Sequence, residues 1–171
     1  MQPSSQSNKT HKAYLSTDTA SELTRCLVFS RLDYCNSILY SIPQQQQDRL
    51  QRIMNKGARI TLNILLPNHL TSSNKNLASL HWLPIKYRIP FKIATITYKT
   101  IFISQPSYFR NLITINKNNK NLCSSSSITL VNQRTSTNIA KRGFRHSSPS
   151  VWNSLPHNIR NCTSFLFYIW N

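Results

Sequence analysis

The sequence contains few acidic residues. It has 21 Lys and Arg but only 4 Asp and Glu, and the acids, Asp18, Glu22, Asp33 and Asp48, form no D-D or D-x-D pair. Polymerases, nucleases and most hydrolases need two or more carboxylates to hold metal ions or exchange protons. We therefore predict that this chain has no catalytic residues and is not an enzyme on its own.

Patterns for metal binding and membrane insertion are also missing. The cysteines, Cys26, Cys35, Cys123 and Cys162, show no C-x2-C spacing, and the histidines show no H-x-x-x-H spacing. We expect free thiols, no metal and no cofactor. The longest apolar run, "FLFYIW", is about a third of a membrane span. With no secretory signal at the N-terminus, an intracellular protein without a membrane partner is expected.

The charge is the strongest feature that the sequence does have. The formal net charge is +17 and the pI is about 10.4. Such a chain repels itself unless a polyanion neutralises it. Nucleic acid, either RNA or DNA, is the partner that this charge favours, ahead of an anionic membrane surface. Binding would be electrostatic and largely independent of base sequence.

Hydrophobic periodicity predicts a mainly α fold, a small bundle of two long helices plus a third. The first helix is expected to begin at Ser16 as N-cap, to include Leu39 and to end before Pro43. The second should run from about Gln45 to Leu65, and the third over 85–103 despite Pro90. On the second helix the expected apolar face comprises Leu50, Ile53, Met54, Gly57, Ile60 and Ile64.

The 171 residues suit one domain, in which the composition marks four regions. Residues 1–12 are predicted to be a disordered basic arm, and 13–104 a helical core with a polar linker at 67–79. Residues 105–148 are predicted to be loops of low complexity, partly disordered. Residues 149–171 are predicted to be a short, truncated C-terminal helical segment.

A stripe of cations accompanies the apolar face of the second predicted helix. Arg49, Arg52, Lys56 and Arg59 gather on one side of it, and Arg88 and Lys92 lie on the third predicted helix. Nucleic-acid backbone is one interpretation of these six residues, and a solvated face is the other. We favour phosphate contact, because only one acid offsets four like charges within three turns.

Other conspicuous residues have a structural interpretation. Asp33, next to Tyr34 and without a second carboxylate nearby, is predicted to form a salt bridge or hydrogen bond within the bundle. Trp82 is predicted to anchor a corner between helices, with stacking on a base as the alternative. Trp152 and Leu155 are predicted to anchor the C-terminal segment.

Several blocks of the sequence occur in an order that resembles a known family. The blocks "YLSTDTASELTRCLVFSRLDYCNSILYSIP", "DRLQRIMNKGARI", "SLHWLPIKYRIPFKIATITYKTIF", "QPSYFRNLI" and "SPSVWNSLPHNIRN" cover roughly residues 11–165. Together they resemble the C-terminal region, after the reverse transcriptase domain, of the endonuclease and reverse transcriptase protein of jockey-type and related LINE (non-LTR) retrotransposons.

The resemblance implies that the chain is one region of a larger retrotransposon protein. The parent protein would be an RNA-directed DNA polymerase with an endonuclease, and this region a basic, non-catalytic helical tail supporting target-primed reverse transcription. It would work in a nuclear or cytoplasmic ribonucleoprotein. Two alternatives remain open: a structural brace for the polymerase thumb, and a functionless translated relic. The relic is favoured by departures from the family pattern, such as "NKNNKNLCSSSS" in place of an Arg- and Ser-containing block.

Overall fold

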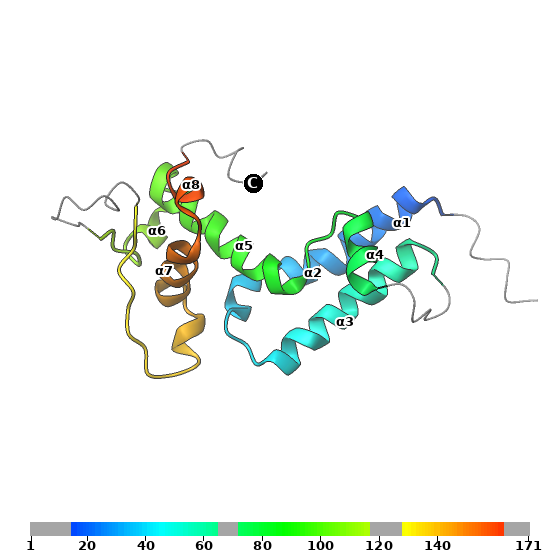
Figure 1. Ribbon diagram of the computed structural model, residues 1–171, viewed down its shortest axis with the longest axis horizontal. Coiled ribbons are helices and arrows are strands. Elements are labelled where there is room, and N and C mark those ends of the chain that lie inside the picture. The colour runs from blue at the N-terminus through cyan, green and yellow to red at the C-terminus, as the bar shows by residue number, and fades with distance from the viewer. Residues whose placement is uncertain (1–14, 65–71, 117–127, 163–171) are drawn as a thin grey trace, which may run out of the picture. The chain divides into compact units, whose positions relative to one another are not determined.

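The computed structural model describes residues 15–64, 72–116 and 128–162, and it confirms a mainly helical fold (Figure 1). The chain forms two compact units instead of one helical core over 13–104. Unit 1 combines Met1–Tyr34 with Asp48–Pro84, and unit 2 combines Cys35–Gln47 with Ile85–Asn171. The predicted arm at 1–12 lies outside the described residues.

Unit 1 begins with a helical stretch that ends earlier than predicted. It consists of α1 (Thr17–Thr24), a π-helical turn (Arg25–Phe29) and α2 (Ser30–Asp33). Ser16 caps α1 as predicted, since its Oγ accepts a hydrogen bond of 3.2 Å from the Thr19 N–H. The prediction that this helix includes Leu39 is wrong, because Cys35 adopts a left-handed backbone with φ of 52°.

The other helices of unit 1 are α3 (Gln44–Thr61), which belongs to this unit from Asp48 onward, and α4 (Ser73–Ser79). α3 matches the second predicted helix closely. α4 lies in the segment 67–79, which we predicted to be a polar linker. It carries one large apolar side chain, Leu77, which is buried. A single apolar residue gives no periodicity, so this helix could not be recognised in the sequence.

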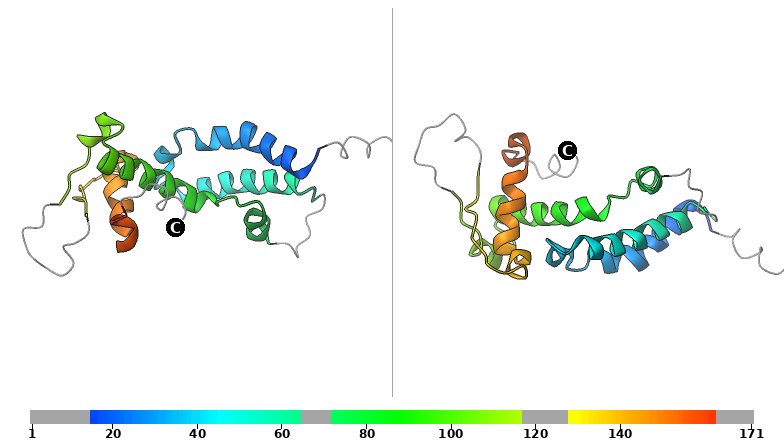
Figure 2. Two further views of the ribbon diagram at one scale, coloured as in Figure 1. Left: turned by 90° about the horizontal axis from the view of Figure 1, so that it is seen from above. Right: turned by 60° about the horizontal axis from the view of Figure 1, so that its bottom comes forward.

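α1 and α3 lie side by side and antiparallel (Figures 1 and 2), at very close approach. The hydroxyls of Thr24 and Thr61 are 3.2 Å apart and hydrogen-bonded. A Cβ atom on Gly57 would lie 3.0 Å from Cγ2 of Thr24. Glycine therefore permits this contact between the helices. Phe29 and Trp82 extend the core, with ring centroids 4.5 Å apart in an edge-to-face pair.

The buried face of α3 differs from the predicted one. Met54, Gly57, Ala58 and Thr61 are buried, at the spacing i, i+3, i+4 and i+7. Ile53 is 47% exposed and Ile60 73%, so their assignment to the core face is wrong. Gly57 and Ala58 have small side chains, so the backbone of α1 can approach α3 closely on this side. The contact line therefore follows Gly57 and Ala58 and leaves both isoleucines at the surface.

Unit 2 is built around two crossing helices, α5 and α7. Its described elements are a 3-10 turn (Asn36–Leu39), α5 (Ile85–Tyr98), a π-helical turn (Lys99–Ile103), α6 (Ser107–Arg110), a second 3-10 turn (Ala140–Arg142), α7 (Phe144–Ser154) and α8 (His157–Arg160). α5 and the turn after it match the third predicted helix, and Pro90 lies within α5. The Thr97 and Ser148 hydroxyls join α5 to α7 at 2.8 Å.

The core of unit 2 includes polar side chains. Trp152 has no exposed surface, and Tyr98 and Ile93 are also fully buried. Ser147 and Ser148 of α7 are buried beside them. The prediction that 105–148 consists of loops is therefore wrong for α6, for the 3-10 turn at Ala140–Arg142 and for the start of α7. Buried serines replaced the apolar periodicity that would have revealed α7.

Trp152 and Asn153 of α7 fasten an extended segment onto unit 2. The Trp152 indole N–H donates to the Ile128 carbonyl at 2.9 Å. The Asn153 amide accepts from the Leu130 N–H at 3.0 Å and donates to the Leu130 carbonyl at 2.8 Å. Leu130 also forms an antiparallel bridge with Ile115. Leu155, which follows α7, is half-buried.

Candidate nucleic-acid interface

The basic stripe, defined as Arg49, Arg52, Lys56 and Arg59, lies on the side of α3 that faces away from α1. The first three side chains are exposed and Arg59 is half-buried. From Arg49 to Arg59 the helix rises by about 15 Å. At a spacing of about 3.4 Å per nucleotide along a strand, the stripe spans roughly four nucleotides.

No carboxylate forms an ion pair with the basic stripe within the described part of the chain, although Asp48 directly precedes Arg49 on α3. The four side chains of the stripe repel one another, since neighbours three and four residues apart on a helix are close. An anion lying along α3 would relieve this repulsion. Ile53 and Ile60 border the stripe, because each follows a cation, Arg49 or Lys56, by four residues.

The remaining predicted contact residues are on α5, in unit 2. Lys92 is exposed, whereas Arg88 is half-buried and already engaged in an interaction within the protein. They are four residues apart and therefore lie on the same side of α5. The structure thus brings four of the predicted cations together on α3, and the other two form a separate pair on α5.

Positive charge is concentrated in the C-terminal part of the chain, a signal that local motifs do not reveal. Residues 1–48 contain four Lys and Arg and all four acids, so they are formally neutral. Residues 49–171 contain 17 Lys and Arg and no Asp or Glu. Unit 2 consequently has twelve Lys and Arg and no aspartate or glutamate. The entire net charge follows Asp48, where α3 begins to present its stripe.

The residues predicted to have structural roles differ in their burial. Trp82 and Trp152 are buried, and Leu155 and Asp33 are half-buried. Asp33 is the last residue of α2 and is engaged in an interaction within the protein. Tyr34, which was predicted with Asp33 to have a structural role, is 80% exposed and lies outside the buried core. The helix ends at Asp33, and the extended backbone of Tyr34 directs its side chain away from the core.

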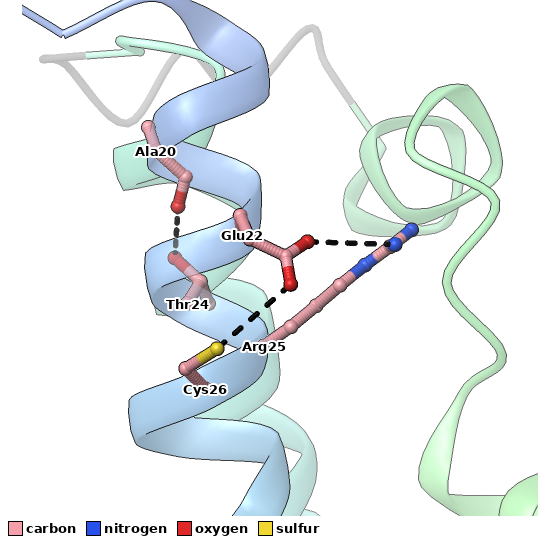
Figure 3. Close-up of polar contacts among 5 residues, drawn as sticks. All are labelled: Ala20, Glu22, Thr24, Arg25 and Cys26. Atoms are coloured by element: carbon pink, nitrogen blue, oxygen red, sulfur yellow. Dashed lines mark hydrogen bonds and ion pairs between the residues drawn. The ribbon is translucent and has the colours of Figure 1, made fainter.

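The Glu22 carboxylate of α1 forms local contacts at the surface (Figure 3). One Glu22 oxygen lies 4.0 Å from Nη1 of Arg25, and the other accepts from the Cys26 thiol at 3.8 Å. The Thr24 hydroxyl donates to the Ala20 carbonyl at 2.9 Å on the same helix. An exposed ion pair of this kind stabilises a protein by about 0–1 kcal/mol.

The described residues also lack the features of a metal site and of a membrane-spanning helix. Within residues 15–64, 72–116 and 128–162, no group of three or more His, Cys, Asp or Glu is placed to hold a metal ion. In the same ranges, no helix has both the length and the apolar character needed to cross a membrane.

No protein-family model, curated protein or solved structure matches this chain. Its function must therefore be inferred from its own residues and from the order of its sequence blocks.

Proposed function

We propose that this chain is a non-catalytic nucleic-acid-binding segment that holds RNA or DNA by its phosphate backbone. The observation that carries the proposal is the basic stripe on α3, three exposed cations and one half-buried cation on one helix face that form no ion pair among the described residues. Lysine and arginine on such a face release counterions from nucleic acid when they bind it. The absence of acids after Asp48 adds a long-range attraction.

The order of the sequence blocks supports a more specific role. They resemble the region after the reverse transcriptase domain in LINE-type retrotransposons. In that setting the stripe would keep template RNA or target DNA near the polymerase during target-primed reverse transcription. The chain would contribute affinity and position within an intracellular ribonucleoprotein, and the polymerase domain would contribute the chemistry.

Reversing charges on the stripe tests this proposal. The Arg52→Glu plus Arg59→Glu variant should weaken binding to both single- and double-stranded oligonucleotides by about tenfold or more at low salt. It should also reduce the slope of log K against log salt by about 1.4 to 1.8, the value for two lost phosphate contacts. Fluorescence anisotropy measures both quantities, and circular dichroism checks that helicity persists.

A matched control separates the stripe from net charge. Arg31→Glu plus Lys75→Glu changes the charge by the same amount on α2 and α4, where both side chains are exposed. This control should retain most of the affinity. Equal losses in both variants would mean that the stripe has no special role.

A second candidate function has one observation in its favour. Ile53 and Ile60 are exposed large apolar side chains beside the stripe. They would suit a brace that packs α3 against the thumb of a parent polymerase. The Ile53→Ser plus Ile60→Ser variant should then lose association with that thumb in a full-length element and keep its affinity for oligonucleotides. Unchanged association would eliminate the brace.

A further inference from the structure

A pocket of about 670 Å³ lies at the end of α5, within unit 2. Its lining comes from the π-helical turn, the following bend and the start of α6: Lys99, Ser104, Gln105, Pro106, Ser107 and Tyr108. The pocket is broadly open to solvent, so a group bound in it would keep part of its surface exposed. None of the residues assigned above to nucleic-acid contact lines this pocket.

The polar groups of the pocket suit an anion. Lys99 contributes an ammonium group, Gln105 an amide, and Ser104 and Ser107 contribute hydroxyls. Arg110 brings a second cation to this wall, because its Nη1 donates to Oγ of Ser104 at 2.6 Å. Lys99 also takes part in an interaction within the protein, but unit 2 contains no aspartate or glutamate whose side chain could neutralise either cation. A phosphate group matches two cations accompanied by hydroxyl donors.

One lining residue, Tyr108, is aromatic, and this indicates which kind of anion the pocket could bind. The Tyr108 side chain is 66% exposed, although a large apolar ring of this kind is often buried in a core. Its ring is held by Phe109, with centroids 4.6 Å apart, and Phe109 stacks on Phe144 of α7 at 4.3 Å. Tyr108 is therefore a supported, solvent-facing ring on which a flat group can stack. Aromatic rings of this kind bind nucleobases without strong sequence preference.

We propose that this pocket binds one unpaired nucleotide, with its base against Tyr108 and its phosphate near Lys99 and Arg110. A base within a duplex is stacked between its neighbours and cannot reach the ring, so the pocket would favour single strands. This inference extends the proposed function, on which it rests for the presence of nucleic acid. It adds a preference for unpaired nucleotides that the α3 stripe alone cannot provide.

The test compares a single-stranded oligothymidylate with a duplex of equal length, using the full chain. Tyr108→Leu removes the aromatic ring and should weaken single-strand binding by roughly 5- to 100-fold, with duplex binding changed less than about twofold. Tyr108→Phe keeps the ring and should bind like the original. Lys99→Gln should reduce the salt slope for the single strand by about 0.7. Thermal unfolding verifies that each variant folds.

Further arms of the experiment identify the ligand and separate the two proposals. Competition by thymidine monophosphate would show that a free nucleotide fills the pocket, and its absence would show that the nucleotide must belong to a strand. Unchanged single-strand binding in Tyr108→Leu would overturn the pocket proposal. Loss of binding on charge reversal at Arg52 and Arg59, combined with no effect at Tyr108, would support the stripe and reject the pocket. The reverse result would support the pocket and reject the stripe.

Discussion

Single residues determine how closely the helices of unit 1 approach. Gly57 faces Thr24 across the contact between α1 and α3, where an added Cβ would lie 3.0 Å from a methyl group. Thr24 cannot easily move away, since its hydroxyl bonds both the Ala20 carbonyl and the Thr61 hydroxyl. The methyl group of Thr24 is therefore what opposes a larger side chain at position 57.

The Gly57→Ala variant should destabilise the fold by about 1 kcal/mol. Overpacking costs about 1–3 kcal/mol and the better helix propensity of alanine returns about 1 kcal/mol. In a Thr24→Ser background, which keeps the hydroxyl but lacks the methyl group, the same change should become stabilising. Urea denaturation measures both effects. Stabilisation by Gly57→Ala in the original background would mean that the two helices are not in close contact.

A second single residue, Tyr98, makes the stability of the fold depend on pH. Burial raises the pKa of its phenol above the ordinary value of 10.0, and the charge of the Cys162 thiolate raises it further. The unfolded chain therefore loses this proton at lower pH than the folded chain. The contribution of the Tyr98 phenol to the free energy of unfolding is therefore complete below pH 10. It decreases as the pH rises through the pKa of the folded state.

The corresponding measurement is the difference in unfolding free energy between the original chain and Tyr98→Phe, recorded from pH 8 to 11. The original should lose stability relative to the variant above about pH 10. Other tyrosines and lysines titrate in both proteins, so the difference isolates Tyr98. A difference that is constant over this range would contradict a raised pKa.

At the scale of elements, α7 stabilises unit 2 by holding an extended segment through one amide. Asn153→Ala would leave the N–H and carbonyl of Leu130 without their partner. An unsatisfied buried group costs about 1–3 kcal/mol, so the thermal midpoint should fall by several degrees. Asn132→Ala is the matched control, because Asn132 receives only a weak 3.4 Å bond from the same amide in an exposed position. Equal effects of the two changes would refute the role of Asn153.

The elements show what the sequence could and could not predict. α3 and α5 were predictable because apolar residues recur at helical spacing, and Ser16 was a recognisable N-cap. α4 and the first half of α7 were not, since one buries a single leucine and the other buries serines, whereas the second half of α7 and α8 fall within the helical segment predicted at 149–171. The buried face of α3 was misassigned because isoleucine outweighs glycine and alanine in hydrophobicity, whereas close packing favours the small residues. Asn153 carries no sequence pattern, because its partner is backbone.

For the candidate site, the sequence predicted the stripe and missed the pocket. The four cations of α3 recur every three or four residues, so their shared face follows from helix geometry. The pocket depends on a left-handed residue at Ser104 and on the position of Tyr108 beside Phe109. Neither feature has a periodicity that would reveal it before the backbone is known.

At the scale of the whole molecule, charge is divided along the chain. The first 48 residues are formally neutral, and every unit of net charge lies after them. A polypeptide of 123 residues with 17 cations and no Asp or Glu is under electrostatic self-repulsion at low salt. Polyphosphate relieves this repulsion, which connects the composition to the proposed binding of nucleic acid.

The salt dependence of duplex binding tests this account most directly. With four stripe contacts, a plot of log K against log salt concentration for the original chain should be linear with a slope of about −3 to −4. The affinity should vary little among duplexes of different sequence. A slope near zero, or no binding at low salt, would contradict the claim that this chain holds nucleic acid by its phosphates.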